Sequence, residues 1–158
     1  MKISGPSLAQ VDRSSDLYRL LEQAHGRIAV KDATTWGSKA AAEAAIRLNW
    51  VDLPETSATL LPQIAKVVAR FKERNRVVLC GMGGSSLGPE VIALSYKKDI
   101  FIFDSTDPNY AQHVITGDLK KTVVVVSSKS GSTIETSAQR SLFQSAFTAA
   151  GLNPIEHI

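Results

Sequence analysis

The first half of the chain places its apolar residues at the spacing of helices and predicts three of them. After two candidate capping serines, Ser14 and Ser15, an apolar face recurs every three or four positions and consists of Leu17, Leu20, Leu21 and Ala24. The alanine-rich stretch 38–50 is strongly helix-forming. A third stretch, 55–75, has an apolar face made of Leu60, Ile64, Val67, Val68 and Phe71. Pro62 falls in the first turn of this third helix, where a missing N–H is tolerated.

From Arg76 onward the pattern changes to short apolar runs rich in β-branched or aromatic residues. Three such runs end in small polar residues, at 76–80, 99–104 and 121–128. Segments of helical length follow them, at 88–98, 108–118 and 134–151. Near-continuous apolar strands that alternate with helices are typical of a parallel sheet covered on both faces. The second half therefore predicts an α/β fold of βαβαβα order.

We expect the chain to divide into a helical N-terminal segment, residues 1–75, which packs on the sheet, and an incomplete sheet domain, residues 76–158. The last six residues, NPIEHI, are typical of the start of a fourth strand. A sheet of three parallel strands is small and leaves an edge exposed. We therefore expect a truncated, N-terminal piece whose natural partner is the remainder of a longer parent chain. The free edge beside residues 122–126 is expected to promote self-association.

Composition and charge exclude several classes of function. The 158 residues are 44% apolar and 21% charged, with a net charge of +3 and scattered basic residues, which argues against a nucleic-acid partner. No apolar run approaches the ~20 residues of a membrane span, so we expect no membrane partner. The single cysteine, Cys80, lies in a strand pattern and is interpreted as a packing residue. Without a disulfide framework or metal cluster, a reducing cytoplasm fits best. The histidines have no ligand spacing and are interpreted as structural: His25, His113 and His157.

Two hydroxyl-rich loops carry the candidate chemistry. The first follows the strand at 76–80 and reads GMGGSSLG, where glycines let the backbone approach a ligand and serines add donors. The second, residues 127–136, reads SSKSGSTIET. Its hydroxyls, backbone amides and one lysine together suit a phosphate. If the first and third strands are neighbours, in the order 2-1-3, the two loops face each other where ligands of open α/β sheets bind.

The hydroxyls of the second loop also admit a purely structural interpretation. Ser132 and Glu135 match a capping box, in which case the loop serves only to cap the helix that follows. Asp107 before Pro108, after the middle strand, is interpreted in the same way as an N-cap followed by a proline in the first helical position.

The first loop resembles two other phosphate motifs less well. A P-loop is excluded because no lysine follows Gly88. The dinucleotide fingerprint is half met: Gly81 and Gly83 fit, but Ser86 occupies the third glycine position. Asp104 stands where a ribose-binding acid would lie, so a Rossmann-type dinucleotide site stays an alternative.

Three blocks, GMGGSSLGPEV, DSTDP and SSKSGSTIET, resemble in order and spacing the motifs of the first sugar-isomerase (SIS) domain of phosphoglucose isomerases. The lead-in, with DATTWG and RLNWVDLP, is similar to bacterial isomerases related to the transaldolase–isomerase fusions. The motif match runs from about Val77 to Thr136. It implies a flavodoxin-like three-layer αβα sandwich of five parallel strands. It also implies an aldose–ketose isomerase, an intramolecular oxidoreductase of glycolysis and gluconeogenesis that interconverts glucose 6-phosphate and fructose 6-phosphate without metal or cofactor.

The resemblance implies a role for each loop residue. Contacts to the hexose 6-phosphate fall to Gly84, Ser85, Ser86, Ser128, Lys129, Ser130, Gly131, Ser132 and Thr133. A supporting role falls to Glu135 and Thr136. The chain departs from the animal enzymes at 130–132, where Ser-Gly-Ser replaces Thr-Phe-Thr, and in the middle block, where Ser-Thr replaces Asn-x. Both changes are conservative for an anion site built from hydroxyls.

The family's catalytic groups have no counterpart in this chain. In phosphoglucose isomerases the ring-opening histidine and lysine, the proton-shuttling glutamate and the enediolate-stabilising arginine all lie later. Proton transfer next to a carbonyl needs a positioned base, and Glu90 and Glu135 do not substitute because both fall at helix starts. We therefore expect no catalytic residue here and no activity of the chain alone. A stand-alone or regulatory SIS module that binds a sugar phosphate is the alternative from another class.

Overall fold

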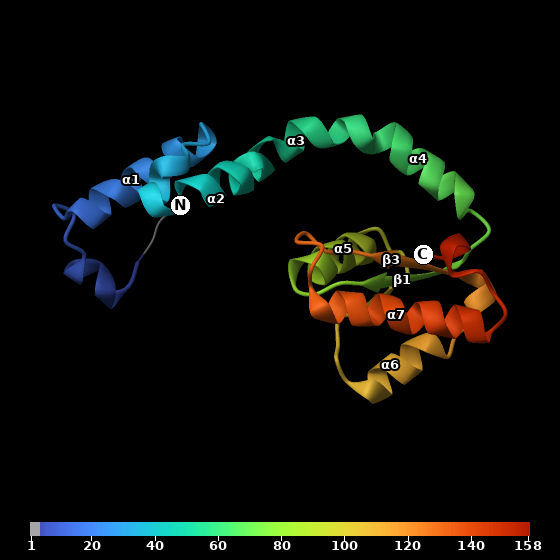
Figure 1. Ribbon diagram of the computed structural model, residues 1–158. Coiled ribbons are helices and arrows are strands. Elements are labelled where there is room, and N and C mark those ends of the chain that lie inside the picture. The colour runs from blue at the N-terminus through green and yellow to red at the C-terminus, as the bar shows by residue number, and fades with distance from the viewer. Residues whose placement is uncertain (1–3) are drawn as a thin grey trace. The chain divides into compact units, whose positions relative to one another are not determined.

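A computed structural model describes residues 4–158 of the chain, drawn as a ribbon in Figure 1. Contacts between residues divide it into two compact units, one that ends at Ile64 and one that spans Ala65–Ile158. The boundary falls inside helix α4, Leu61–Arg70. None of the helices in the described range is long and apolar enough to cross a membrane. The packing of residues 1–75 on the sheet stays a prediction.

The unit before Ala65 is built from short helices. α1, Asp16–Ala29, begins at Ser15, whose hydroxyl accepts a hydrogen bond from Tyr18 N at 3.2 Å, so the first predicted helix and its serine cap are confirmed. α2 spans Ala41–Arg47 and α3 spans Leu53–Thr56. Short 3-10 helices lie between and before them, at Pro6–Gln10, Ala33–Trp36, Ser38–Ala40, Leu48–Asp52 and Ser57–Leu60.

The second and third helices are shorter than the sequence predicts. The second is α-helical only over α2, and the third only over α4 and the last two residues of α3. Two prolines explain the breaks. Pro54 has no N–H to donate to Trp50 O, and Pro62 has none for Ala58 O, so a regular α-helix cannot pass either position. Tighter 3-10 turns precede both prolines instead, and Pro62 lies in the first turn of α4 as predicted.

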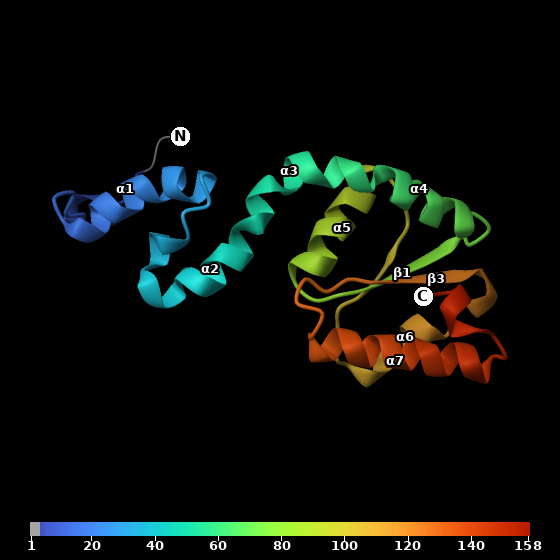
Figure 2. The same cartoon turned by 45° about the horizontal axis from the view of Figure 1, so that its top comes forward.

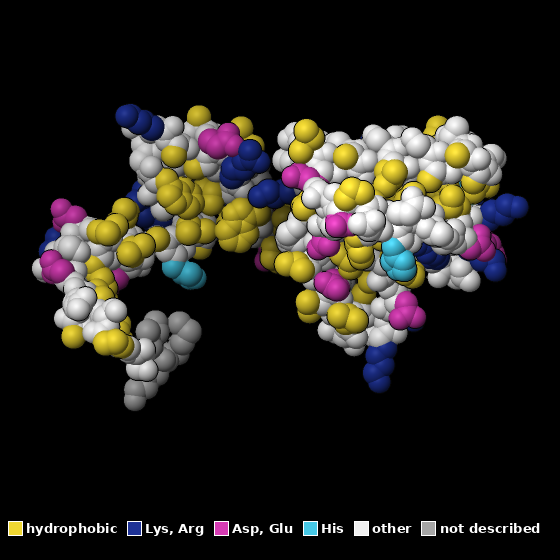
Figure 3. All heavy atoms as spheres, turned by 90° about the horizontal axis from the view of Figure 1, so that it is seen from below, with side chains coloured by type: hydrophobic (Ala, Val, Ile, Leu, Met, Phe, Trp, Pro, Cys, Tyr) yellow, Lys and Arg dark blue, Asp and Glu magenta, His cyan; other side chains and the backbone are white. Residues whose placement is uncertain are grey.

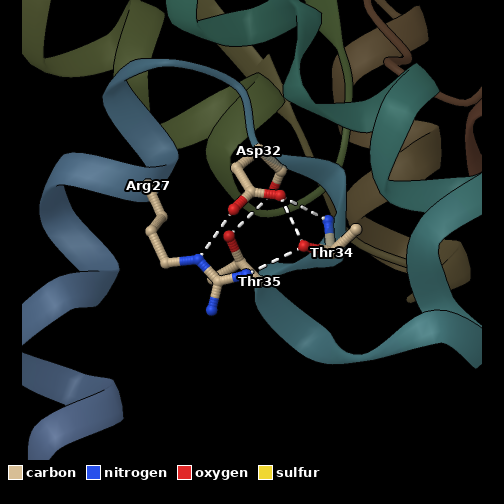
Figure 4. Close-up of polar contacts among 4 residues, drawn as sticks. All are labelled: Arg27, Asp32, Thr34 and Thr35. Atoms are coloured by element: carbon tan, nitrogen blue, oxygen red, sulfur yellow. Dashed lines mark hydrogen bonds and ion pairs between the residues drawn. The ribbon is translucent and has the colours of Figure 1, made fainter.

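A polar cluster closes the turn after α1 (Figure 4). Asp32 accepts hydrogen bonds from Arg27 Nε at 2.8 Å and from Thr34, through its hydroxyl at 2.7 Å and its backbone N–H at 2.9 Å. Thr35 donates its hydroxyl to Asp32 O at 2.6 Å. Hydrogen bonds from Thr34 and Arg27 lower the pKa of Asp32 to about 2. The ionised carboxylate therefore fixes the direction in which the chain leaves α1.

The helical unit has little interior. Of residues 4–64, only Thr35, Ala44 and Leu48 are buried. Both tryptophans, Trp36 and Trp50, are more than half exposed. Figure 3 shows hydrophobic side chains across the visible face of this unit. The apolar faces of the predicted amphipathic helices are therefore not buried by other residues of this unit.

The unit after Ile64 contains a parallel sheet of three strands in the order β2-β1-β3. β1 is Arg76–Cys80, β2 is Phe101–Phe103 and β3 is Thr122–Val126. Val78 lies opposite Phe101 on one side and Val124 on the other. The helices that follow the strands are α5 (Gly84–Ser95), α6 (Pro108–Ile115) and α7 (Ile134–Ala149). The predicted α/β fold class is confirmed, and the first and third strands are neighbours.

The core lies between the sheet and helices α6 and α7, which share one face of the sheet in Figures 1 and 2. It consists of Val78, Cys80, Phe103, Val114, Val124, Phe143 and Phe147. Burial raises the pKa of the Cys80 thiol to about 12, which agrees with its interpretation as a packing residue. On the other face Val125 of β3 remains exposed, so the expected covering of both faces is complete on one face only.

The last residues dock against β3. Pro154–Glu156 form a 3-10 turn, and the residue after them, His157, is buried. Its ring stacks on Phe147, and its Nδ1 lies 2.9 Å from Thr122 O. Its backbone oxygen accepts a hydrogen bond from Val124 N at 2.7 Å. The structural interpretation of this histidine is confirmed, while a fourth strand stays a prediction.

Candidate functional site

The loops after β1 and β3 meet at the C-terminal edge of the sheet. Ser127 N donates to Cys80 O at 2.8 Å, and Gly81 N donates to Phe103 O of β2 at 3.3 Å. Gly81 has no room for a side chain, because a Cβ there would lie 3.0 Å from Ser85 O and 3.3 Å from Ser127 O. The backbone of one loop therefore lies directly against the backbone of the other.

The two serines of the loop after β1 differ in their access to a ligand. This loop turns at Gly83, whose φ of 57° and ψ of −125° suit only glycine, and α5 begins there. Ser86 is fully buried, and its single hydroxyl proton has two acceptors within reach, Gly83 O at 2.9 Å and Asp104 Oδ2 at 3.3 Å. Ser85 is half-buried, Gly84 is exposed, and the Ser85 hydroxyl makes no hydrogen bond within residues 4–158. Ser86 thus fixes the turn, and Ser85 remains available.

In the loop after β3, hydroxyl groups gather around Thr133. Its Oγ1 lies 3.1 Å from Ser128 Oγ and 3.3 Å from Ser130 Oγ. Gly131 N donates to Ser128 Oγ at 3.1 Å, and Ser132 N donates to Ser130 Oγ at 3.2 Å. Three hydroxyls and two backbone amides of this loop are therefore brought together, as the sequence predicts for an anion site.

Helix α7 begins without a side-chain cap. Its N-cap residue is Thr133, which makes no capping hydrogen bond. The capping-box interpretation of Ser132 and Glu135 is therefore wrong, because α7 begins one residue later than a cap at Ser132 would require. The first N–H groups of α7 are left without a side-chain acceptor. By contrast, Asp107 caps α6 as predicted and accepts from two backbone N–H groups, at 2.7 and 2.9 Å.

A cavity of about 430 Å³ opens beside the loop after β3. Its lining includes Ser128, Thr133, Thr136 and Arg140. Thr136 is buried, and its hydroxyl has no hydrogen-bond partner. Lys129 is exposed and, like Arg140, makes no ion pair within the described residues. Hydroxyl donors and two unpaired cations suit an anion. Over the same residues, no group of three or more His, Cys, Asp or Glu side chains is placed to bind a metal ion.

The sequence motifs do not predict two residues that lie near these loops, Arg140 and Gln139. Arg140 lies two turns after Thr133 on α7, so helical periodicity alone places it on the face of the cavity. Gln139 is buried and links α7 to the first loop, with Nε2 3.7 Å from Met82 Sδ, while its Oε1 has no partner. Glu135, predicted in a supporting role, lines a separate cavity of about 300 Å³ together with Gln139.

Curated proteins similar to this chain match it over part of their length, whereas no family model matches it. A glucose-6-phosphate isomerase of Chlamydia trachomatis serovar L2 is 40% identical in an alignment of 97 residues that covers 57% of this chain and 18% of that protein. A glucose-6-phosphate isomerase of Thermus thermophilus is 35% identical in an alignment of 132 residues that covers 78% of this chain and 28% of that protein. The chain thus spans less than a third of the length of these relatives.

The solved structures that are similar to this one include two bacterial proteins. A crystal structure of a glucose-6-phosphate isomerase from Chlamydia trachomatis has a TM-score of 0.58 at 29% identity, covering 82% of this chain and 26% of that one. A hypothetical protein from Thermus thermophilus has a TM-score of 0.64 at 29% identity, covering 83% of this chain and 30% of that one. Together with the curated relatives, they confirm the resemblance to phosphoglucose isomerase that the three loop motifs predict.

Proposed function

We propose that this chain is the N-terminal, phosphate-binding part of a glucose-6-phosphate isomerase, in which it forms an incomplete first SIS domain. One observation supports the proposal above all: the two serine loops meet at Gly81, whose Cβ would fall 3.0 to 3.3 Å from the backbone of both. The parent enzyme interconverts glucose 6-phosphate and fructose 6-phosphate, and a cytoplasmic location goes with that glycolytic role.

The loop after β3 binds the phosphate group. Ser128, Ser130 and Thr133 bond to one another in the free chain, and each hydroxyl can rotate to donate to a phosphate oxygen. The uncapped N–H groups of α7 and the positive end of its dipole favour the same anion. Lys129 adds a flexible point charge. Gly131 and Ser132 orient the loop hydroxyls, because their backbone amides donate to Ser128 Oγ and Ser130 Oγ.

The loop after β1 contacts the sugar. Gly84 leaves the backbone open, and Ser85 offers a hydroxyl with no partner within residues 4–158. Ser86 does not contact the sugar directly, because its hydroxyl is already bonded within the protein, to Gly83 or Asp104. In this arrangement Ser86 holds the loop in shape rather than touching the ligand.

The chain alone binds the substrate but does not isomerise it. Moving a proton between C1 and C2 of the sugar needs a base placed at those carbons. Glu135 lines a cavity separate from that of the hydroxyl loop, and Glu90 lies on α5. Neither is placed for that task, so we expect turnover only when the rest of the isomerase is present.

An NMR titration of the nitrogen-15-labelled chain tests this function. Inorganic phosphate and fructose 6-phosphate are expected to shift the amide signals of residues 84–86 and 128–136, with weak affinity since part of the site is absent. NAD is expected to shift neither set. Binding of NAD in place of the phosphates would replace the proposal with the dinucleotide-binding alternative.

A matched pair of double variants locates the binding site. Ser128→Ala with Lys129→Ala is expected to lower the affinity for phosphate by about tenfold or more, because a hydroxyl donor and a cation are both lost. Ser95→Ala with Lys97→Ala removes the same two residue types at the far end of α5 and is expected to leave the affinity unchanged. Equal effects of the two variants would contradict the placement.

A further inference from the structure

A cavity of about 300 Å³ lies beside the loop after β2, to which the proposed function assigns no ligand. Ser105 and Thr106 of that loop line one side of it, and Glu135 and Gln139 of α7 line another. None of residues 4–158 lines both this cavity and the one beside the loop after β3. In the order β2-β1-β3, β2 is the edge strand away from β3. The cavity therefore does not open along the β3 edge, where further strands are expected.

The polar groups of this cavity have unused hydrogen-bonding capacity. Gln139 is 4% exposed, and its Oε1 has no donor. Its Nε2 lies 3.7 Å from Met82 Sδ, which is a weak acceptor, so the amide is held loosely and can turn its oxygen toward the cavity. Glu135 makes no ion pair within residues 4–158. A buried acceptor without a donor is costly, so the cavity favours a ligand that brings hydrogen-bond donors.

The remaining lining of the cavity is apolar. It includes Phe103 at the end of β2, Ala111 of α6 and Leu142 of α7. No lysine or arginine of the described residues lines the cavity, so Glu135 makes it unfavourable for a phosphate or another anion. A short polyhydroxylated chain suits it better, because the C–H groups pack on the apolar lining while the hydroxyls reach the acceptors.

The strand order places the three loops at the C-terminal edge of the sheet in one row. Because β1 lies between β2 and β3, the loop after β1 lies between the loop after β3 and this cavity. Neighbouring strands are about 4.8 Å apart, so roughly 10 Å separates the end of β3 from the end of β2. An extended hexose 6-phosphate has a similar length, since five carbon–carbon bonds of about 1.5 Å join C6 to C1 and the phosphate ester adds to them.

We propose that this cavity binds the hydroxyl-bearing end of an open-chain sugar phosphate, the end farthest from its phosphate group. Gln139 and Glu135 accept hydrogen bonds from the sugar hydroxyls. Ser105 Oγ already accepts from Asp107 N at 3.0 Å, and its own proton is free to donate to the sugar. The assignment rests on the phosphate lying at the loop after β3, as in the proposed function. It adds the residues that distinguish a hexose phosphate from a shorter phosphate ester.

Two phosphate esters of different length test this assignment on the full chain. Sorbitol 6-phosphate cannot close into a ring and is long enough to reach the cavity, whereas glycerol 3-phosphate has the same charged group on a shorter chain. NMR titration is expected to show sorbitol 6-phosphate binding about fivefold tighter, the effect of one net hydrogen bond. Only sorbitol 6-phosphate should shift the backbone amides of Ser105 and Thr106 and the side-chain amide of Gln139.

The possible failures of this titration are distinguishable. Equal affinities, with no shift at Ser105, Thr106 and Gln139, would overturn this inference and leave phosphate binding at the loop after β3 intact. If neither ester binds, and inorganic phosphate does not bind either, the proposed function and this inference fall together.

A matched pair of variants on α7 assigns the preference to this cavity. Gln139→Met keeps the length of the side chain and removes its amide, and Gln144→Met makes the same change at a residue that lines neither cavity. Gln139→Met is expected to abolish the fivefold preference for sorbitol 6-phosphate and to leave the affinity for inorganic phosphate unchanged. Its stability should not fall, because an acceptor without a donor is removed. A loss of stability with the preference retained would mean a purely structural role and overturn the proposal.

Glu135→Ala provides a second test if Gln139→Met fails to fold. Removing a carboxylate strengthens the binding of any phosphate ester by a similar factor, so the ratio of the two affinities is the informative quantity. The proposal expects this ratio to fall, because a hydrogen bond to the longer ester alone is lost. An unchanged ratio would show that Glu135 acts only through its charge and would overturn the proposal.

Discussion

His157 stacks on Phe147 with ring centroids 4.5 Å apart and an interplanar angle of 26°. Its Nδ1 lies 2.9 Å from Thr122 O, and its Nε2 lies 3.5 Å from Arg74 Nη2. A carbonyl oxygen only accepts hydrogen bonds and a guanidinium only donates them, so the neutral ring carries its proton on Nδ1. One buried side chain thereby joins α7, the start of β3 and the segment that leads into β1.

Replacing this histidine is expected to destabilise the sheet unit. His157→Ala removes a buried stacked ring and its hydrogen bond, so we expect the free energy of unfolding to fall by about 2–3 kcal/mol. Urea unfolding followed through the valine methyl signals of β3 measures the change. His113→Ala, at an exposed position on α6, is expected to cost less than about 0.5 kcal/mol. A similar loss in both variants would contradict the joining role.

A methyl group at Gly81 is expected to push the two serine loops apart. Gly81→Ala places Cβ 3.0 Å from Ser85 O, and the contacting atoms belong to the backbone, which has little freedom to move. We expect a loss of about 1–3 kcal/mol in stability together with weaker phosphate binding. Gly26→Ala is the control: nothing lies within 4 Å of a Cβ built there, and inside α1 the added methyl group should increase stability by about 0.5–1 kcal/mol. Thermal unfolding measures the stability of both variants, and titration measures their affinity for phosphate. Unchanged stability and affinity in Gly81→Ala would contradict the close contact of the two loops.

Acid is expected to loosen the turn after α1. The pKa of Asp32 in the folded chain, about 2, lies below its ordinary value of 3.8, so the ionised form favours the folded state. This contribution is fully present above about pH 4 and is lost as the pH falls towards 2. Carbon-13 NMR of the carboxyl group should show a titration midpoint near this folded-state pKa. Arg27→Gln is expected to move it upward, whereas Arg19→Gln, which removes the exposed pair with Asp16, should leave it in place.

Cys80 is expected to resist alkylation while the sheet is folded. Its pKa of about 12 leaves less than about one thiol in a thousand ionised at pH 8, and the side chain is fully buried. Iodoacetamide at that pH should therefore label the chain only after urea is added, as mass spectrometry would show. Rapid labelling in buffer alone would mean that β1 is open to solvent.

The fold class and the positions of the loops could be predicted because the periodicity of the second half is strong. Near-continuous apolar runs located the strands. The order 2-1-3 was only a condition for the two serine loops to face each other, and the structure meets that condition. Competition between alternative hydrogen bonds within a loop was harder to predict. Ser132 and Glu135 have the spacing of a capping box, yet the hydroxyls around Thr133 bond to one another. Pro62 was placed correctly, but its effect on the preceding turn was not, because a missing donor acts on the carbonyl four residues earlier.

The shallow interior of the helical unit determines which part of the chain opens first. With three buried residues between positions 4 and 64, few apolar contacts separate its closed form from an open one. Amide hydrogens of α1 and α2 should then exchange with deuterium well before those of β1 and β3. Any polypeptide that covers these helices would slow that exchange. The exchange rate of the α1 amides would therefore show directly whether the apolar faces of this unit are covered.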